Sequence, residues 1–174
     1  MSADARSVDA VEWRIRPAVQ TDAAAIAALW APMIRDTLVT FNTALKPPED
    51  VAALIAARAA DGHGFLLVET GAELAGFAHY GQFRAGPGYA HTMEHTIILA
   101  PRAQGRGIGR ALMTALEEHA RAGGAHSMFA GVSSGNPAGR DFHARLGYAE
   151  VAVLREVGRK FGRWLDLHLM QKML

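Results

Sequence analysis

The chain has 174 residues, half of them hydrophobic, and its 18 basic and 17 acidic residues nearly balance. We expect one domain with a sizeable core over residues 12–174, preceded by a loose leader at 1–11. The interspersed charges create no field for nucleic acid or a membrane surface. The lack of cysteine excludes disulfides and thiolate chemistry. Because the leader is charged where a signal peptide needs an apolar segment, the expected location is the cytoplasm.

Strand and helix signals follow one another along the chain with short turns between them. In chain order the pattern predicts a strand at 13–17, helices starting at Thr21 and at Pro47-Pro48, strands at 65–69 and 73–80, a strand at 96–100, a helix at 106–122, a strand at 127–132, a helix at 136–146, and strands at 148–154 and 164–173. The strand at 96–100 is apolar without interruption, which predicts burial on both faces. We expect it to pair with the preceding hairpin and to lie parallel to the strand at 127–132.

The loop at 104–110 has the composition of a phosphate-binding segment. Three glycines alternate in it: Gly105, Gly107 and Gly109. An apolar helical period begins inside the loop, so the first N–H groups of that helix lack partners and carry the positive end of its dipole. An anion is therefore the expected occupant. Three arginines are near enough in sequence to assist: Arg102, Arg106 and Arg110.

Three motifs compete for this loop, and their spacing separates them. A P-loop needs GxxxxGK followed by Ser or Thr, which the chain lacks. The Rossmann fingerprint needs GxGxxG, but Arg110 follows the alternating glycines. The remaining pattern, Q/R-x-x-G-x-G/A, runs from Gln104 to Gly109 and resembles the coenzyme A pyrophosphate loop of the GNAT superfamily of N-acetyltransferases. A glycine-rich turn that only joins a strand to a helix remains the alternative.

A second motif strengthens this resemblance. The segment from Asn136 to Tyr148 is similar to the family pattern NxxAxxxYxxxGF, because Gly147 and Tyr148 follow Asn136 by eleven and twelve positions. Stretches at 83–95, 104–110 and 157–167 resemble the phosphinothricin and methionine sulfoximine acetyltransferases, and the likeness covers nearly the whole chain. It implies an α+β fold in which helices flank a mixed, mostly antiparallel sheet. In that fold the central strand and the strand at 127–132 splay apart to admit the pantetheine arm.

The resemblance implies transfer of acetyl from acetyl-CoA to the α-amine of a small amino-acid-like substrate. Glu94 stands where the phosphinothricin group has its proposed base, although a solvated strand-end carboxylate is the alternative. His143 replaces the tyrosine of the wider family, and it either supplies a proton or only orients the thiol. The expected cofactor contacts are Ile97, Ile98 and Leu99 through backbone N–H groups, Gln104, Gly105, Arg106, Gly107, Ile108, Gly109 and Arg110 in the loop, and Asn136.

Substrate contacts are sought in the segments before the central strand. Arg84 is the best-placed cation for a substrate carboxylate, and Phe41, Tyr89 and Thr92 are candidate pocket walls. A solvated loop arginine is the alternative for Arg84. Ala90 stands where several relatives have arginine, which argues against phosphinothricin itself.

The sequence is also compatible with other classes of function. No histidine cluster has metal-ligand spacing, so no metal is expected. One rival is an acetyltransferase for another amine, such as a protein N-terminus. The other rival is a non-catalytic acyl-CoA sensing module.

The segment at 160–166 bears on assembly. It places Phe161 and Trp164 in a glycine-containing turn before the last strand, where a monomer would expose an apolar patch. A homodimer would cover this patch. The alternative is that both aromatic rings fold back onto their own core.

Overall fold

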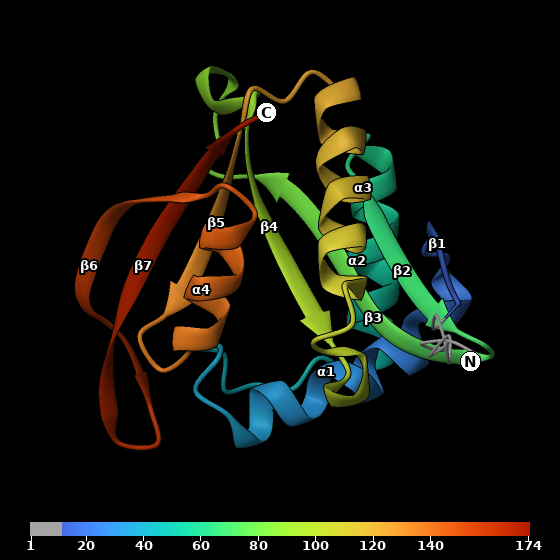
Figure 1. Ribbon diagram of the computed structural model, residues 1–174, viewed down its shortest axis with the longest axis horizontal. Helices are drawn as coiled ribbons and strands as arrows, with labels where there is room; N and C mark the ends of the chain where they lie inside the picture. Colours follow the sequence, from blue (N-terminus) through green and yellow to red (C-terminus); the bar gives the residue numbers. More distant parts are fainter. Residues whose placement is uncertain (1–11) are drawn as a thin grey trace, which may run out of the picture.

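The computed structural model describes residues 12–174, and the leader expected at 1–11 lies outside the described residues. The strands are β1 (Trp13–Pro17), β2 (Phe65–Thr70), β3 (Glu73–Gln82), β4 (Thr92–Leu99), β5 (Ser127–Ser133), β6 (Ala149–Lys160) and β7 (Arg163–Met173). The main helices are α1 (Ala23–Asp36), α2 (Pro48–Ala60), α3 (Ile108–Ala122) and α4 (Pro137–Arg145). All seven strands form one sheet in the order β1-β2-β3-β4-β5-β7-β6 (Figure 1). Only β4 and β5 pair in parallel among these strands, so the predicted mixed, mostly antiparallel sheet is confirmed.

Helices cover both faces of the sheet, as strand alternation requires. On β3, Phe77 points into a cluster formed with α1 and α2. The neighbouring Ala78 and Tyr80 belong to a second cluster, formed with α3. In Figure 1, α3 and α4 lie in front of the sheet and α2 lies behind it, while α1, which shares a cluster with α2, runs along the lower edge of the view. The two layers bring different elements to the two sides of β4.

Two local predictions need correction. Thr21 does not cap α1: residues Gln20–Asp22 form a 3-10 turn, and the carboxylate of Asp22 accepts the N–H of Val19 instead. The central strand starts at Thr92, and its apolar end at 96–99 is half-buried rather than covered on both faces. The cause is the loss of its neighbour on one edge.

That loss of pairing is the feature that builds the site. β4 pairs with β5 only from Thr92 to His95, against Ser127 to Ala130. Beyond this point the two strands diverge, and Figure 1 shows them far apart at the ends of their arrows. The splay implied by the family resemblance is therefore present, and its apex lies at His95 and Ala130.

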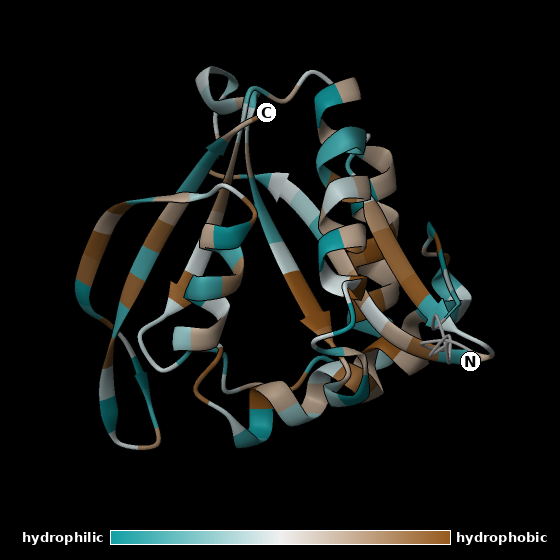
Figure 2. Ribbon diagram, in the orientation of Figure 1, coloured by the Kyte–Doolittle hydropathy of each residue, from teal (hydrophilic) through white to brown (hydrophobic). Residues whose placement is uncertain are grey.

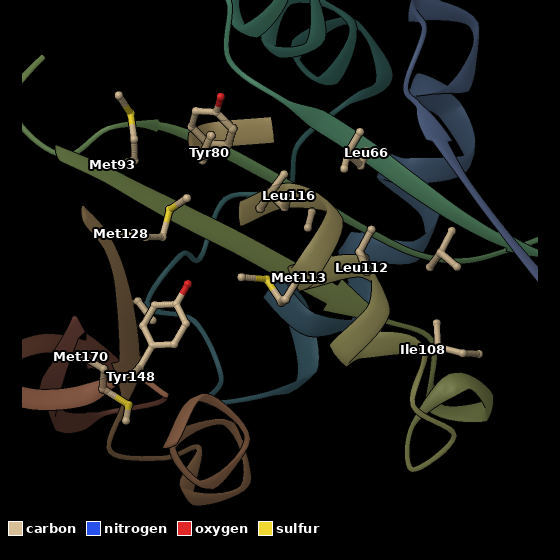
Figure 3. Packing of buried hydrophobic residues seen from close by; sticks show 14 of the residues in the cluster. Leu66, Tyr80, Met93, Ile108, Leu112, Met113, Leu116, Met128, Tyr148 and Met170 are labelled. Carbon is tan, nitrogen blue, oxygen red and sulfur yellow. The ribbon is translucent and has the colours of Figure 1, made fainter. Parts of the chain in front are cut away.

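A buried polar contact holds α3 and the C-terminal strands together beside the gap. The Tyr148 hydroxyl donates to Oε1 of Glu117, and Lys172 Nζ donates to the other carboxylate oxygen. Figure 3 shows Tyr148 packed in the same cluster as Met113, on α3, and Met170, on β7. Because Glu117 is buried and both its oxygens are paired, α3 is held in a fixed position relative to β7.

Candidate active site

A cleft of about 630 Å³ opens where β4 and β5 separate. Its walls come from α1 and the segment after it, from β4, from the loop before α3, and from β5 and α4. Ten residues expected from the sequence line it: Ile97, Ile98, Leu99, Gln104, Gly105, Gly107, Gly109, Arg110, Asn136 and His143.

The cleft passes through the sheet. Ile98 packs against the α1 and α2 cluster, whereas Ile97 and Leu99 pack against the α3 cluster, yet all three line the same space. A ligand in the gap is therefore accessible from both faces. One reactant can enter from the α1 side while another occupies the α3 side.

The open edge of β4 presents backbone donors to this gap. Phe83 N–H donates to the Thr92 carbonyl, and Ala100 N–H donates to the Ala75 carbonyl. Backbone N–H groups alternate in direction along an antiparallel strand. The N–H groups of Ile97 and Leu99 therefore point away from β3 and into the gap. The N–H of Ile98, which the sequence offered as a third donor, faces β3 instead.

The glycine loop forms an open cradle at the start of α3. Gly107 is its N-cap with φ of 80°, and Gly105 has φ of 72°. A Cβ added at either position would meet nothing within 4 Å, so the backbone is exposed to a ligand there. Gly109 is different, because a Cβ there would lie 2.8 Å from Leu99 and 3.1 Å from Phe142. Its role is to let α3 pack closely beside the cleft.

The side chains around the cradle divide into those that face it and those that do not. Arg110 lines the cleft and donates to the Arg145 carbonyl. Ile108 is fully buried in the core, which leaves only its N–H for a ligand. Arg106 is exposed and does not line the cleft. Arg102 donates to the Leu74 carbonyl and pairs with Glu73, so it is held away from the loop.

Asn136 has a structural task that the sequence motif did not reveal. It caps α4, with Oδ1 accepting the Gly139 N–H at 2.9 Å. Its amide nitrogen is left as the donor available to a ligand, because the residue also lines the cleft. This cap fixes the start of α4 beside the gap.

Glu94 lies one residue before the apex and on the opposite face of β4 from His95. It is not itself a cleft-lining residue, but its Oε1 is 3.0 Å from the position of a Cβ added at Gly131, which lines the cleft. The glycine leaves room for the carboxylate at the edge of the gap. Burial raises the pKa of Glu94 above its ordinary value, which makes it a stronger base than a solvated carboxylate.

His143 lies on α4 with its ring toward the cleft. Its Nδ1 lies 2.7 Å from the Gly139 carbonyl, which can only accept, so Nδ1 carries the proton. Nε2 is buried and has no partner within residues 12–174. Burial lowers the pKa of His143, so the ring is neutral at pH 7 and Nε2 is an acceptor rather than an acid.

The four expected substrate residues do not line the cleft. Phe41 packs on Gly158 of β6, and the cleft wall comes instead from its neighbours Val39, Thr40 and Asn42. Tyr89 is exposed, and Thr92 lies on the paired end of β4.

Arg84 is exposed, and its guanidinium lies 5.6 Å from the centroid of the Phe83 ring. Phe83 stacks on Phe129 at 4.4 Å, and Phe129 pairs with Glu94 across the two strands. Arg84 is therefore on the Glu94 side of the sheet.

Within residues 12–174, no group of three His, Asp or Glu side chains is placed to hold a metal ion. No helix in that range is both long and apolar enough to cross a membrane.

A helix N-terminus open to an anion, a strand edge with free donors and a gap through the sheet together define an acyl-CoA-dependent transferase. Residues 31–148 match the model of the acetyltransferase (GNAT) family. The chain belongs to this family and is an N-acetyltransferase that uses acetyl-CoA.

Relatives and solved structures agree with this assignment. The chain is 38% identical to the L-amino acid N-acyltransferase MnaT of Escherichia coli, over 92% of this chain and 93% of that protein. It is 38% identical to a phosphinothricin N-acetyltransferase of Streptomyces coelicolor, over 90% and 93% of the two chains. It is 36% identical to the L-methionine sulfoximine/L-methionine sulfone acetyltransferase of Salmonella typhimurium, over 92% and 94%.

Two solved structures superpose over most of the chain. The yncA protein of Salmonella typhimurium, solved with its cofactor acetyl-CoA, has a TM-score of 0.88 at 36% identity, covering 93% of this chain and 94% of that one. The ribosomal-protein-alanine N-acetyltransferase of Brucella melitensis also has a TM-score of 0.88, at 38% identity, covering 92% and 99%.

Proposed function

We propose that this enzyme acetylates the α-amine of a small amino-acid-like substrate by direct attack on the thioester of acetyl-CoA. The observation that carries the proposal is the gap through the sheet, with Glu94 at its edge on one face and the glycine cradle on the other. The amine approaches from the α1 side and the cofactor from the α3 side. The nucleophile and the leaving group are then on opposite sides of the carbonyl.

Three groups divide the chemistry. Glu94 removes the proton that the amine loses, directly or through a water molecule. The N–H groups of Ile97 and Leu99 hold the pantetheine, and the Ile97 N–H, nearer the apex, polarises the carbonyl oxygen. The free N–H groups at the start of α3 bind the pyrophosphate, assisted by Arg110.

The substrate class is supported by the names of the relatives, which act on L-amino acids, phosphinothricin, methionine sulfoximine and methionine sulfone. Such substrates carry a carboxylate, and Arg84 on the Glu94 side is our candidate for binding it. Tyr89 and Thr92 are further candidates for contact with the substrate. Phe41 would act indirectly, by supporting the part of the cleft wall formed by Thr40.

A protein N-terminus is the second candidate substrate, because the similar Brucella protein is named for acetylating a ribosomal-protein alanine. A thiol-release assay with acetyl-CoA separates the two. We expect turnover with methionine sulfone, methionine sulfoximine or free amino acids, and little with peptides. Turnover confined to peptides would reject the small-substrate proposal.

Replacing Asn136 tests its role toward the cofactor. We expect Asn136→Ala to raise the acetyl-CoA KM about two- to tenfold, the effect of one lost hydrogen bond of roughly 0.5–1.5 kcal/mol. Because the cap of α4 is also lost, the variant should be destabilised by about 1 kcal/mol. Asn136→Asp is the matched control, since it keeps the cap but lacks the amide donor. An unchanged KM in both variants would show that Asn136 only caps α4.

We also propose that the enzyme is a homodimer through the β6 edge. Phe161 and Trp164 are each 58% exposed, so they do not fold back onto their own core. Val151 and Val157 on β6 are more than half exposed as well. Figure 2 shows apolar positions along this edge strand. An exposed apolar edge strand of this kind favours a self-complementary interface.

Light scattering of Trp164→Ala tests this interface. We expect a wild-type dimer at micromolar concentration, and a variant that dissociates while its circular dichroism spectrum stays unchanged. The control is Trp13→Ala, which removes another partly exposed tryptophan on the far edge strand β1. A wild-type monomer, or a Trp164→Ala dimer of undiminished affinity, would contradict the proposal.

A further inference from the structure

His95 is a buried histidine for which the reaction described above has no use. It sits at the apex of the gap, lines the cleft and is 7% exposed. Neither of its ring nitrogens has a hydrogen-bond partner within the described residues. Leaving such a group unpaired costs about 1–3 kcal/mol for each donor or acceptor, and because this ring borders the cleft, a polar ligand in the cleft would satisfy it.

A second buried histidine shows what a purely structural ring looks like here. His79 on β3 is 6% exposed, and its nitrogens are also without partners in the described part of the chain. It packs among Phe65, Phe77 and Trp30 and does not line the cleft. His95 differs from it in one respect that matters: its ring borders the cleft.

His95 has a histidine neighbour in the same cleft. The centroid of its ring is 5.0 Å from that of His143, whose Nδ1–H is already committed to the Gly139 carbonyl. The unpaired atoms are therefore both nitrogens of His95 and Nε2 of His143. One nitrogen of a neutral His95 carries a proton. The two histidine rings therefore offer at least one hydrogen-bond donor and one acceptor to a ligand group in the cleft.

The geometry of the gap indicates which ligand group lies beside these rings. The glycine cradle is at the wide end beside Leu99, and the strands converge at His95. A pantetheine arm that starts at the cradle and follows the open edge of β4 ends at the apex. His95 points to the α3 face, where the cofactor lies, whereas Glu94 points to the amine face. The sulfur of the cofactor is the polar atom that arrives beside the two rings.

We propose that His95 and His143 form the receptor for the cofactor sulfur, with a His95 ring N–H donating to the sulfur and His143 Nε2 accepting from the thiol product. As the amine nitrogen bonds to the carbonyl carbon, the C–S bond breaks and its electron pair goes to sulfur. The His95 N–H stabilises the thiolate while it forms. The proton that the amine nitrogen loses goes to Glu94 and from there to solvent, and the thiolate takes up one proton from solvent, so the protons balance and no further reactant is needed.

Burial lowers the pKa of both rings, because a charged imidazole is poorly solvated there. Both are therefore neutral at pH 7, and the receptor acts by hydrogen bonding rather than by proton donation. This inference rests on the proposed function. It adds a residue, His95, that acts on the leaving group.

Calorimetry with coenzyme A and desulfo-coenzyme A, which has hydrogen in place of the thiol, tests the receptor. We expect His95→Phe to weaken coenzyme A binding about tenfold and to leave desulfo-coenzyme A unchanged. His79→Phe, the matched control, should alter neither affinity. His95→Gln, which retains an N–H donor, should recover part of the loss and serves if the phenylalanine variant does not fold.

The outcomes separate this inference from the proposed function. If His95→Phe and His95→Gln each changed the affinity for coenzyme A and for desulfo-coenzyme A by the same factor, the receptor would be overturned. The transferase proposal would remain intact. A wild-type protein that fails to distinguish coenzyme A from desulfo-coenzyme A would overturn it as well. A wild-type protein that binds neither ligand would overturn the proposed function and the receptor together.

Discussion

Glu94→Gln should lower kcat about 10²- to 10⁴-fold, the range expected when a general base is removed. Gln fills the same space beside Gly131 but cannot accept the proton of the amine. Because Glu94 lies outside the proposed cofactor site, the affinity for acetyl-CoA should not change. Stopped-flow thiol release and calorimetry measure the two quantities separately. A sensing module would show no turnover even in the wild type. An enzyme in which Glu94 is not the base would keep its wild-type rate in the variant.

The pH dependence follows from the raised pKa of Glu94. The base must be ionised, so kcat/KM should fall as the pH drops through a pKa above that of a free glutamate, and this acid limb should disappear in Glu94→Gln. Glu118→Gln is the control, because Glu118 is an exposed glutamate on α3. A Glu94→Gln variant that retains the same acid limb would assign the ionisation to another group.

The same substitution has a predictable effect on stability. Burial raises the folded pKa of Glu94, so its ionised form is disfavoured in the folded state. This cost is absent below the unfolded pKa and fully present above the folded pKa. Glu94→Gln should therefore melt at a higher temperature than wild type at pH 7, and at a similar temperature near pH 3. A substitution that raises the stability and lowers the turnover is the result expected when a catalytic residue is replaced.

Local sequence patterns were sufficient to predict which residues line the α3 side of the cleft, where we propose that the cofactor binds. The alternating glycines, the start of a helix after them and Asn136-Pro137 are all short-range signals, and the three glycines and Asn136 line the cleft. Their geometry depends on backbone angles and helix ends, which neighbouring residues determine.

The residues predicted for substrate contact do not line the cleft, because long-range packing decides which side chains reach it. Phe41 turned away from the cleft because Gly158, far along the chain, leaves room for its ring. Lys160 adds a hydrogen bond to the Thr40 carbonyl at 3.0 Å, which holds the same segment against β6 and β7. No local pattern around Phe41 contains this information.

His95 was missed for a related reason. The sequence shows a histidine between Met93 and Ile97, in an alternating apolar row, which is the pattern of a core position. What gives it chemical access is the loss of β5 as a neighbour immediately beyond it. The available signal was a polar residue at an inward-facing position of the strand that leads to the glycine loop.

Gly107→Val should weaken acetyl-CoA binding at least about a hundredfold, as expected when charge-assisted hydrogen bonds to the pyrophosphate are lost. The position has φ of 80°, and the Val side chain would project into the open space beside the loop where we propose that the pyrophosphate binds. A β-branched residue at this φ also costs about 1–3 kcal/mol of stability, which by itself could disturb any site.

Gly71→Val separates these two effects. Gly71 lies in the β2–β3 turn with φ of 61°, and a Cβ added there also meets nothing within 4 Å. Both variants should therefore melt at reduced temperature by comparable amounts, because both place a β-branched residue in the left-handed region. Only Gly107→Val should lose the cofactor in calorimetry. If Gly71→Val lost affinity to the same extent, the loss would come from backbone strain, and the loop at 104–110 would be only a turn between a strand and a helix.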